Sequence, residues 1–333
     1  MARLQKNTGR MLMKLKMKAI GLAVAIIIGI SGCGIIQKDT TEGKVIDGKE
    51  VIAVVNGENI LKSDFDSQVN QVKSALEANG QDFSTDEGKK NLQEIKKKVL
   101  DSMIKDVLSL QQAKKENVTL KPNQMQEAVS QLETYHGGKD ALDNYLKQQG
   151  MDWKSFEKLL QDQLIINNLK EKLTANVKVS DEDVKKYFDS NKDMFKLPSP
   201  EIRASHILVP TEDEANKVLA EIKAGEDFAE LARKYSTDPG SKDKGGDLGY
   251  FGKGKMVPEF EKAAFALKQG EVSQPVKTQF GYHIIKVTGE RTSLSFDDVK
   301  DYIKSNLLTS KKDEEFNKFL DQWQKQSKIE KYL

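Results

Sequence analysis

Two of the three histidines in the chain lie in short stretches that alternate like β-strands. His206 lies in RASHILV and His283 lies in GYHIIKV, so each imidazole shares one strand face with apolar side chains. Both rings can therefore point from a sheet toward its core. Such a pair is compatible with a structural hydrogen bond, with a metal site, or with acid–base chemistry.

The other residue types argue against a metal centre and against a serine hydrolase. A zinc site needs three or four nitrogen, sulfur or oxygen ligands. The one cysteine, Cys33, and the third histidine, His136, both lie far from His206 and His283 in sequence, and no HExxH motif is present. The G-x-S-x-G motif of many serine hydrolases is absent as well. We therefore expect no metal and no cofactor.

A glycine-rich stretch, Gly245–Leu267, resembles a phosphate-binding loop only at first sight. A Walker loop requires G-K-[ST], but here Lys255 is followed by Met256. The dinucleotide fingerprint requires a βαβ unit with an acidic partner, and none is evident. The glycines instead allow tight turns and close backbone approach, and Pro258 suits the first turn of a following helix. The stretch therefore predicts scaffolding for an apolar pocket.

A mixed block of strands and helices, at about 200–290, must position these residues. Pro198 and Pro200 favour extended chain, and EIRASHILV then alternates like a strand. The next helix begins with a predicted capping box formed by Thr211 and Glu214. DFAELARKYS predicts another helix, and VSQPVKTQFGYHIIKVTGE predicts two strands.

Helical periodicity dominates on both sides of this block. Val51–Ile60 predicts a hairpin that turns at Asn56-Gly57, and Ser63 is expected to cap a helix that ends at Ala78. Ser180 and Asp183 predict a second capping box. Further helices are expected at about 95–110, 122–135, 139–149, 153–173, 180–191 and 295–331.

Several motifs together resemble the parvulin family of peptidyl-prolyl isomerases. RASHILV, YSTDPGSKDKGGDLGYFGKGKMVPEFEKAAFAL and TQFGYHIIKV occur in the family's order and at matching distances. VIAVVNGENILKSDFD and the returning C-terminal helices resemble the SurA-like chaperone domain, and the whole chain resembles PrsA-type extracellular foldases of Gram-positive bacteria. The resemblance implies an α+β fold. A parvulin-type antiparallel sheet with surrounding helices would be inserted in a mostly α-helical chaperone domain built from N- and C-terminal segments.

The resemblance also implies site residues. The catalytic residues would be His206, Asp238 and His283, and the substrate-binding residues would be Leu248, Phe251, Met256, Phe260 and Thr278. Met256 and Phe260 would line the pocket for the proline ring, Leu248 and Phe251 would form its rim, and Thr278 would lie near the histidines.

Some of these roles stay open. Asp238 precedes a proline, so an ordinary turn is an alternative for it. Asp247 is expected to be a turn or capping residue. Phe280 departs from those relatives that carry a small polar residue there. For the histidines we favour shape and hydrogen bonding over proton transfer, because isomerisation of a peptide bond moves no proton.

Residues 1–32 are predicted to be a lipoprotein signal peptide. A basic stretch precedes the apolar run Ala19–Ile30, which is shorter than the roughly 20 residues that span a membrane. ISGC resembles the bacterial lipoprotein processing site, which implies cleavage before Cys33 and diacylglycerol on its sulfur. An uncleaved signal anchor is the alternative.

The charge distribution argues against a nucleic-acid partner. The formal net charge is +2, but residues 1–32 carry six basic and no acidic residues, so the rest of the chain is mildly acidic. Nucleic-acid binding needs a basic footprint, which is absent outside the leader. A solute-binding protein would show alternating α/β pattern in two lobes, and this chain does not.

The expected organisation is a signal peptide at 1–32, a membrane tether at 33–50, a helical chaperone domain at 51–197 and 291–333, and an isomerase domain at 198–290. We expect a lipid-anchored isomerase and foldase that assists the folding of secreted proteins at the extracytoplasmic face of the cell membrane. Its partners would be unfolded or partly folded secreted proteins and the membrane. A homodimer is the assembly considered. The alternative is a holdase chaperone in which isomerase activity is minor.

Overall fold

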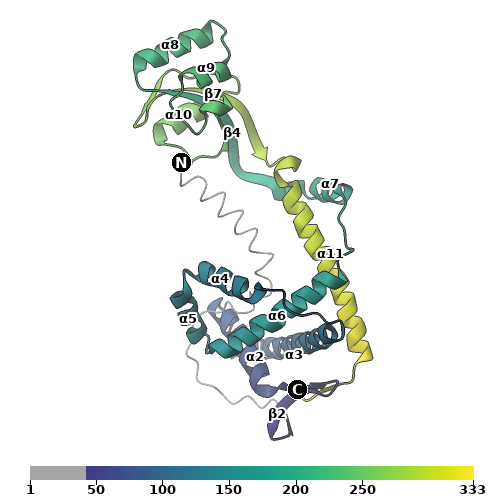
Figure 1. Cartoon of the computed structure of the whole chain (residues 1–333). Helices are drawn as coiled ribbons and strands as arrows, with labels where there is room; N and C mark the ends of the chain where they lie inside the picture. Colours follow the sequence, from purple (N-terminus) through teal and green to yellow (C-terminus); the bar gives the residue numbers. More distant parts are fainter. Residues whose placement is uncertain (1–42) are drawn as a thin grey trace. The chain divides into compact units, whose positions relative to one another are not determined.

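The computed structural model describes residues 43–333, and these residues form two compact units. One unit comprises 179–306, and the other comprises 43–178 together with 307–333 (Figure 1). The predicted signal peptide, Cys33 and most of the predicted tether lie outside the described residues. Among the residues described, no helix is both long enough and apolar enough to cross a membrane.

The unit formed by 43–178 and 307–333 contains a small antiparallel sheet centred on β2 (Lys49–Val55). Three short strands pair with it: β1 (Lys44–Ile46), β3 (Glu58–Leu61) and β8 (Ile329–Lys331). The predicted hairpin is confirmed. Asn56 and Gly57 form its turn with φ angles of 51° and 87°, as a two-residue hairpin turn requires.

The helices of this unit follow the predicted apolar periodicity. They are α2 (Lys62–Ala78), α3 (Asp86–Lys115), α4 (Gln124–His136), α5 (Lys139–Gln148), α6 (Trp153–Leu173) and the C-terminal part of α11 (Phe296–Gln326). Two expectations were wrong. Ser63 lies inside α2, whose N-cap is Leu61 without a side-chain cap. The last helix ends at Gln326, because the chain beyond it pairs with β2 as β8.

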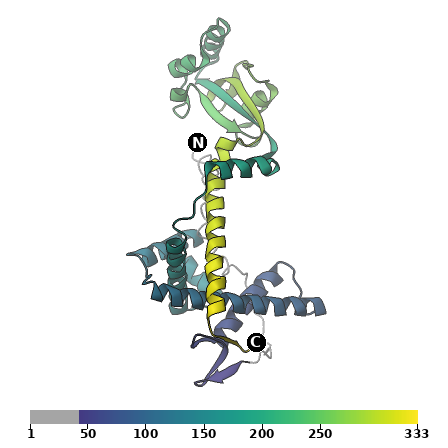
Figure 2. The ribbon, with the colours of Figure 1, turned by 90° about the vertical axis from the view of Figure 1, so that its right-hand side faces the viewer.

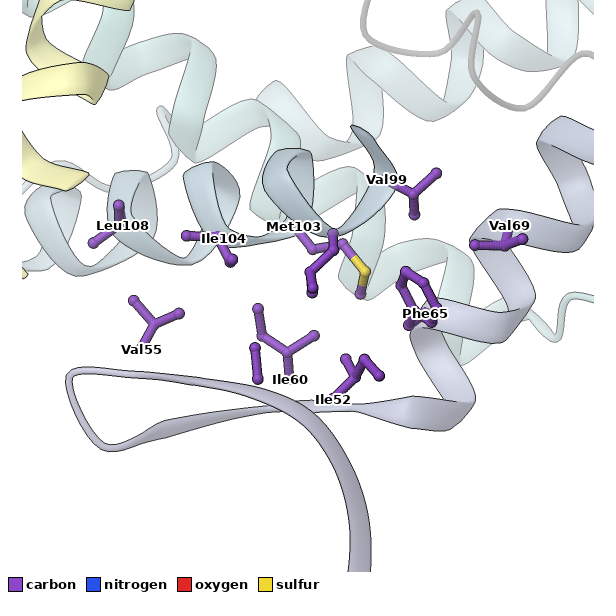
Figure 3. Packing of buried hydrophobic residues seen from close by; sticks show 11 residues of the cluster. Ile52, Val55, Ile60, Phe65, Val69, Val99, Met103, Ile104 and Leu108 are labelled. Atoms are coloured by element: carbon purple, nitrogen blue, oxygen red, sulfur yellow. The ribbon is translucent and has the colours of Figure 1, made fainter. Parts of the chain in front are cut away.

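The hairpin, α2 and α3 enclose a large hydrophobic cluster of this unit (Figure 3). Leu100, Ile104 and Leu108 follow each other at i, i+4 and i+8, so they form one stripe along α3. Ile52 and Ile60 from the hairpin meet this stripe. Each fully buried side chain of this kind contributes about 1.5–3 kcal/mol, so the hairpin of β2 and β3 is held against α3 by non-directional packing.

The unit of residues 179–306 contains a four-stranded antiparallel sheet in the order β5-β4-β7-β6 (Figure 2). The strands are β4 (Lys196–Val209), β5 (Asp247–Phe251), β6 (Val276–Thr278) and β7 (Gly281–Ser293). Residues of α8 (Glu212–Lys223) and α9 (Phe228–Tyr235) pack on one face of the sheet. Residues of α10 (Pro258–Ala266) pack on the other face (Figure 1).

The helix ends in this unit follow from local sequence. Both predicted capping boxes are present, Ser180 with Asp183 at the start of α7 (Asp181–Ser190) and Thr211 with Glu214 at the start of α8. Pro258 occupies the first turn of α10, where its missing N–H costs nothing. The α+β fold, with an antiparallel sheet among helices and helical segments on both sides in sequence, is confirmed.

Candidate active site

The register of β4 and β7 brings the two sheet histidines together. His206 pairs with Ile285, and His283 pairs with Leu208, so the imidazoles are diagonal neighbours on one face of the sheet. Their Nδ1 atoms are 3.0 Å apart and their rings are stacked, with centroids 5.2 Å apart at an interplanar angle of 18°. Each histidine is only 5% exposed, so the pair is a buried polar group inside a sheet–helix core.

A turn after α9 supplies the partners of His206. The Nε2 atom of His206 is 2.9 Å from Oδ2 of Asp238 and 2.9 Å from Oγ of Ser241. The Ser241 hydroxyl also donates to Asp238 Oδ2 at 2.6 Å, and the N–H of Gly240 donates to Asp238 Oδ1 at 3.2 Å. Asp238 is 4% exposed. Its carboxylate therefore does more than start a turn, because it joins the histidine network.

The hairpin of β6 and β7 supplies the partner of the second histidine. Thr278 Oγ1 is 2.9 Å from Nε2 of His283, and the N–H of Phe280 donates to Thr278 Oγ1 at 3.1 Å. Gly281 offers a more distant acceptor for the threonine hydroxyl, at 3.4 Å. Thr278 thus lies beside the histidines, and the departure at Phe280 leaves this corner hydrogen-bonded through the backbone.

The environment keeps both histidines neutral and the aspartate ionised near pH 7. Burial lowers the pKa of His206, and the hydrogen bond and charge of Asp238 oppose burial only in part. Burial and the neighbouring His206 lower the pKa of His283 to about 4. Burial raises the pKa of Asp238, but hydrogen bonds from Ser241, His206 and Gly240 outweigh burial and hold the pKa below its ordinary value.

With these charge states, counting protons gives each hydrogen bond a direction. The ionised Asp238 only accepts, so His206 carries its proton on Nε2 and leaves Nδ1 as an acceptor. His283 must then donate from Nδ1, and its free Nε2 accepts from the Thr278 hydroxyl. These tautomers are assigned from the network of partners. These hydrogen bonds fix the orientation of both imidazoles while both rings stay neutral.

An aromatic wall from α10 closes the other side of the histidine pair. The Phe260 ring stands edge-on to both imidazoles, with centroids 5.8 Å from His206 and 5.3 Å from His283. Met256 and Leu248, both half-buried, pack against the same cluster. Phe251, expected at the rim of the pocket, also belongs to this cluster. This side chain is 4% exposed and packs against Phe260 and Phe265, so it supports the wall from within the core.

The glycine-rich stretch works as scaffolding, as predicted. Gly246 has φ of 80°, and a Cβ atom there would lie 2.2 Å from the carbonyl oxygen of His206. The carbonyl of Gly246 in turn accepts from the N–H of His206 at 2.9 Å. The strand β5 inside this stretch was not foreseen. Asp247, expected as a turn or capping residue, lies in β5 and forms an ion pair with Arg203 at 2.6 Å.

The structure places the predicted catalytic and substrate-binding residues in one unit, 179–306, and adds one residue that sequence reasoning missed. That residue is Ser241, a buried serine three positions after Asp238. Its only signal in the sequence is its place in the turn DPGS. His136 lies in the other unit, where its ring packs 4.5 Å from that of Tyr145. Among residues 43–333, no group of three or more histidine, cysteine, aspartate or glutamate residues is arranged to hold a metal ion.

Comparison with known proteins finds two family models in this chain. Residues 195–289 match the family model of the PPIC-type PPIASE domain, and residues 1–170 match that of the SurA-like N-terminal domain. Foldase protein PrsA of Caldanaerobacter subterraneus subsp. tengcongensis is 38% identical over 93% of this chain and 96% of that protein. Foldase protein PrsA of Clostridium botulinum strain Hall is 38% identical over 92% of this chain and 94% of that protein.

The crystal structure of the peptidylprolyl isomerase PrsA from Bacillus anthracis is also similar. It is 34% identical in sequence and covers 68% of this chain and 96% of its own, with a TM-score of 0.29. The identity and coverage of the curated relatives, together with both family models, are enough to assign the family. The chain belongs to the PrsA foldases, and its block of β4 to β7 is a parvulin-type peptidyl-prolyl cis-trans isomerase domain.

Proposed function

We propose that this isomerase and foldase is anchored by lipid at the outer face of the cell membrane, where it assists the folding of secreted proteins after export. We further propose that its catalytic residues are His206, Asp238 and His283, in an isomerase domain at 198–290. The observation that carries the site assignment is the buried, neutral histidine pair that lies edge-on to Phe260.

The chemistry requires no bond to be broken. Resonance resists rotation about the peptide C–N bond with a barrier of ~18–20 kcal/mol, and uncatalysed X-Pro isomerisation is slow enough to limit folding. An enzyme accelerates it by holding the proline ring and by stabilising the twisted amide over the planar one. The twisted amide has lost conjugation and is less polar, so a water-poor site favours it.

The residues of the site suit these demands. Met256 can adapt to the irregular surface of a proline ring, and Phe260 gives it a flat wall. Leu248 extends the apolar surface, and Phe251 supports it from the core. The hydrogen bond from Thr278 to His283 holds the second imidazole in place. The histidine network thus preserves the shape of the pocket and places no positive charge beside the twisting amide.

The test is a protease-coupled isomerisation assay on a proline peptide, with the chain from residue 34 onward. A triple variant, Asp238→Ala, Met256→Ala and Phe260→Ala, is expected to lose most of the catalysed rate while circular dichroism still reports a folded chain. Met194→Ala is the control, because this methionine in the same unit is 68% exposed and lies outside the site. A folded triple variant that isomerises at the wild-type rate would refute the assignment.

A second candidate function is a holdase that binds unfolded clients without isomerising them. The exposed large apolar side chains of the helical unit favour it, among them Tyr135, Leu159 and Leu76 on its helices. Clients would be unfolded or partly folded secreted proteins. In an aggregation-suppression assay the triple variant is expected to protect a client as well as the wild type does. If suppression is lost together with isomerase activity, the holdase function is not separate.

The anchor and the assembly state belong to the same proposal. Cys33 follows a short apolar run that lies outside the described residues. Palmitate labelling is expected to disappear in Cys33→Ala, and labelling that persists would exclude this anchor. A homodimer is proposed as the assembled form, and sedimentation of the soluble chain across a concentration series tests it.

A further inference from the structure

Ser241 is a buried polar residue beside the histidine site that is neither a proposed catalytic nor a proposed substrate-binding residue. It lies four residues before Gly245, is 1% exposed, and ends the turn that begins at Asp238. Its hydroxyl touches two ionisable side chains at once. It donates to Asp238 Oδ2 at 2.6 Å, and its oxygen lies 2.9 Å from Nε2 of His206. The hydroxyl therefore bridges the carboxylate and the imidazole.

The backbone of Ser241 ties the same residues together by a second route. The carbonyl of Ser241 accepts from the N–H of Gly246 at 2.9 Å. The carbonyl of Gly246 accepts from the N–H of His206, also at 2.9 Å. The serine thus reaches His206 through its side chain and through the glycine-rich loop. A shift of Ser241 would move both contacts together.

Two other buried serines in this unit, Ser236 and Ser273, have a different kind of environment. The Ser236 hydroxyl accepts from the backbone N–H groups of Leu208 and Asp238. The Ser273 hydroxyl accepts from the backbone N–H of Ile285. Both therefore satisfy backbone donors, which any domain must satisfy to fold. Ser241 instead binds the two side chains whose orientation determines the tautomer of the histidine pair.

We propose that Ser241 is a positioning residue for the isomerase reaction, whose hydroxyl fixes the Asp238 carboxylate and thereby holds His206 as the Nε2–H tautomer. The proposal rests on the proposed function of the histidine site. Without the hydroxyl, Asp238 Oδ2 loses its shortest donor inside a buried site, and the carboxylate is free to rotate away from His206. If His206 instead carries its proton on Nδ1, it becomes the donor in the hydrogen bond to Nδ1 of His283. His283 must then carry its own proton on Nε2, so the Thr278 hydroxyl can no longer donate to it.

The experiment combines kinetics with imidazole ¹⁵N NMR on the chain from residue 34 onward, which contains every residue that the structure describes. Ser241→Ala is expected to lower kcat/KM for a proline peptide about tenfold, the effect of losing a hydrogen bond to a charged group. It is also expected to replace the single Nε2–H signal pattern of His206 by a mixture of tautomers. Ser273→Ala, the matched control, is expected to change neither readout.

A rescue variant separates positioning from folding. Ser241→Cys keeps a weak donor of similar size, so its kcat/KM and its tautomer ratio should lie between those of wild type and Ser241→Ala. If Ser241→Ala does not fold, the cysteine variant decides the question. Wild-type kinetics together with a wild-type tautomer in a folded Ser241 variant would overturn the proposal. An inactive wild type would refute the proposed function instead, and the NMR result would still report on Ser241.

Discussion

The two units use buried polar groups in different ways. In the helical unit, the buried hydroxyls of Ser109 and Thr174 each donate to a carbonyl one turn earlier in sequence, so their partners are local. In the isomerase unit, His206 meets His283 and Asp238, which lie 77 and 32 residues away. The hydroxyls of Ser109 and Thr174 find their hydrogen-bond partners as soon as their own helix forms. The histidines find theirs only when the whole isomerase domain is folded. Substitutions should therefore have different consequences in the two units.

Glycine-to-alanine substitutions should produce the largest difference in stability loss between the two units. At Gly246, a Cβ would lie 2.2 Å from the His206 carbonyl oxygen, and φ is 80°. We expect Gly246→Ala to destabilise the isomerase unit by about 4 kcal/mol or more and to abolish activity. At Gly57 φ is 87° and no atom lies within 4 Å, so Gly57→Ala should cost only about 1 kcal/mol. Calorimetry measures the loss of unfolding free energy in both variants. Equal losses would contradict the expected difference between the two units.

Truncation in the aliphatic core should separate stability from activity. Ile104 is fully buried in α3, and Ile104→Ala is expected to destabilise the helical unit by about 2–5 kcal/mol. Below its unfolding temperature this variant should isomerise a short proline peptide at the wild-type rate. Urea unfolding and the protease-coupled assay test this, with the partly exposed Leu76→Ala as the control. A large loss of catalysis would mean that the isomerase depends on the helical core.

Acid should weaken the isomerase unit through its buried histidines. The pKa of His283 is lowered from 6.5 to about 4 in the folded chain, so between these pH values the unfolded state binds more protons. The stabilisation is present above pH 6.5 and is lost as the pH falls toward 4, by about 2–3 kcal/mol. Urea unfolding at pH 7 and pH 4.5 measures it. A wild-type chain with the same pH dependence as His283→Gln would disprove the effect.

The half-buried carboxyl of Asp106, in the helical unit, should change stability with pH in the opposite direction. Burial and the neighbouring Asp162 raise the pKa of Asp106 to about 6, so the folded state binds more protons between about pH 4 and pH 6. This group therefore costs stability at pH 7.5 and ceases to do so as the pH falls. We expect Asp106→Asn to raise the unfolding free energy by about 3 kcal/mol at pH 7.5 and by only about 1 kcal/mol at pH 4.5. An equal gain at both pH values would exclude a titration effect.

Features set by neighbouring residues were predictable. The Asn56-Gly57 turn, the capping box at Ser180 and the boundaries of α6 all follow from short patterns that contain their own partners. Features set by distant partners were missed. β8 is a strand because β2 offers it an edge, and Asn56 binds the backbone of Lys328 just before it.

In the candidate site, too, locally determined features were predictable and features that depend on distant partners were not. The alternation around His206 and His283 predicted that both imidazoles point into a core, and the sheet register bears this out. The inward position of Phe251 and the ion pair of Asp247 depend on β5, whose pairing with β4 was not foreseen. Ser241 gave no signal beyond its turn, because its second partner, His206, reaches it from β4, 35 residues away.

By itself, the sequence determined most of the helices, the strands that carry the two histidines, and which residues are chemically able to build a proline pocket; β5 and β8 depended on their partner strands. Their order and spacing also pointed to the correct family. Only the tertiary structure decided the direction of the hydrogen bonds. Those bonds join β4, β7 and the turn at Asp238, and their geometry exists only once the sheet is paired and α10 has covered it. Burial then lowers the pKa of each histidine, so the neutral state of the pair is a property of the folded domain.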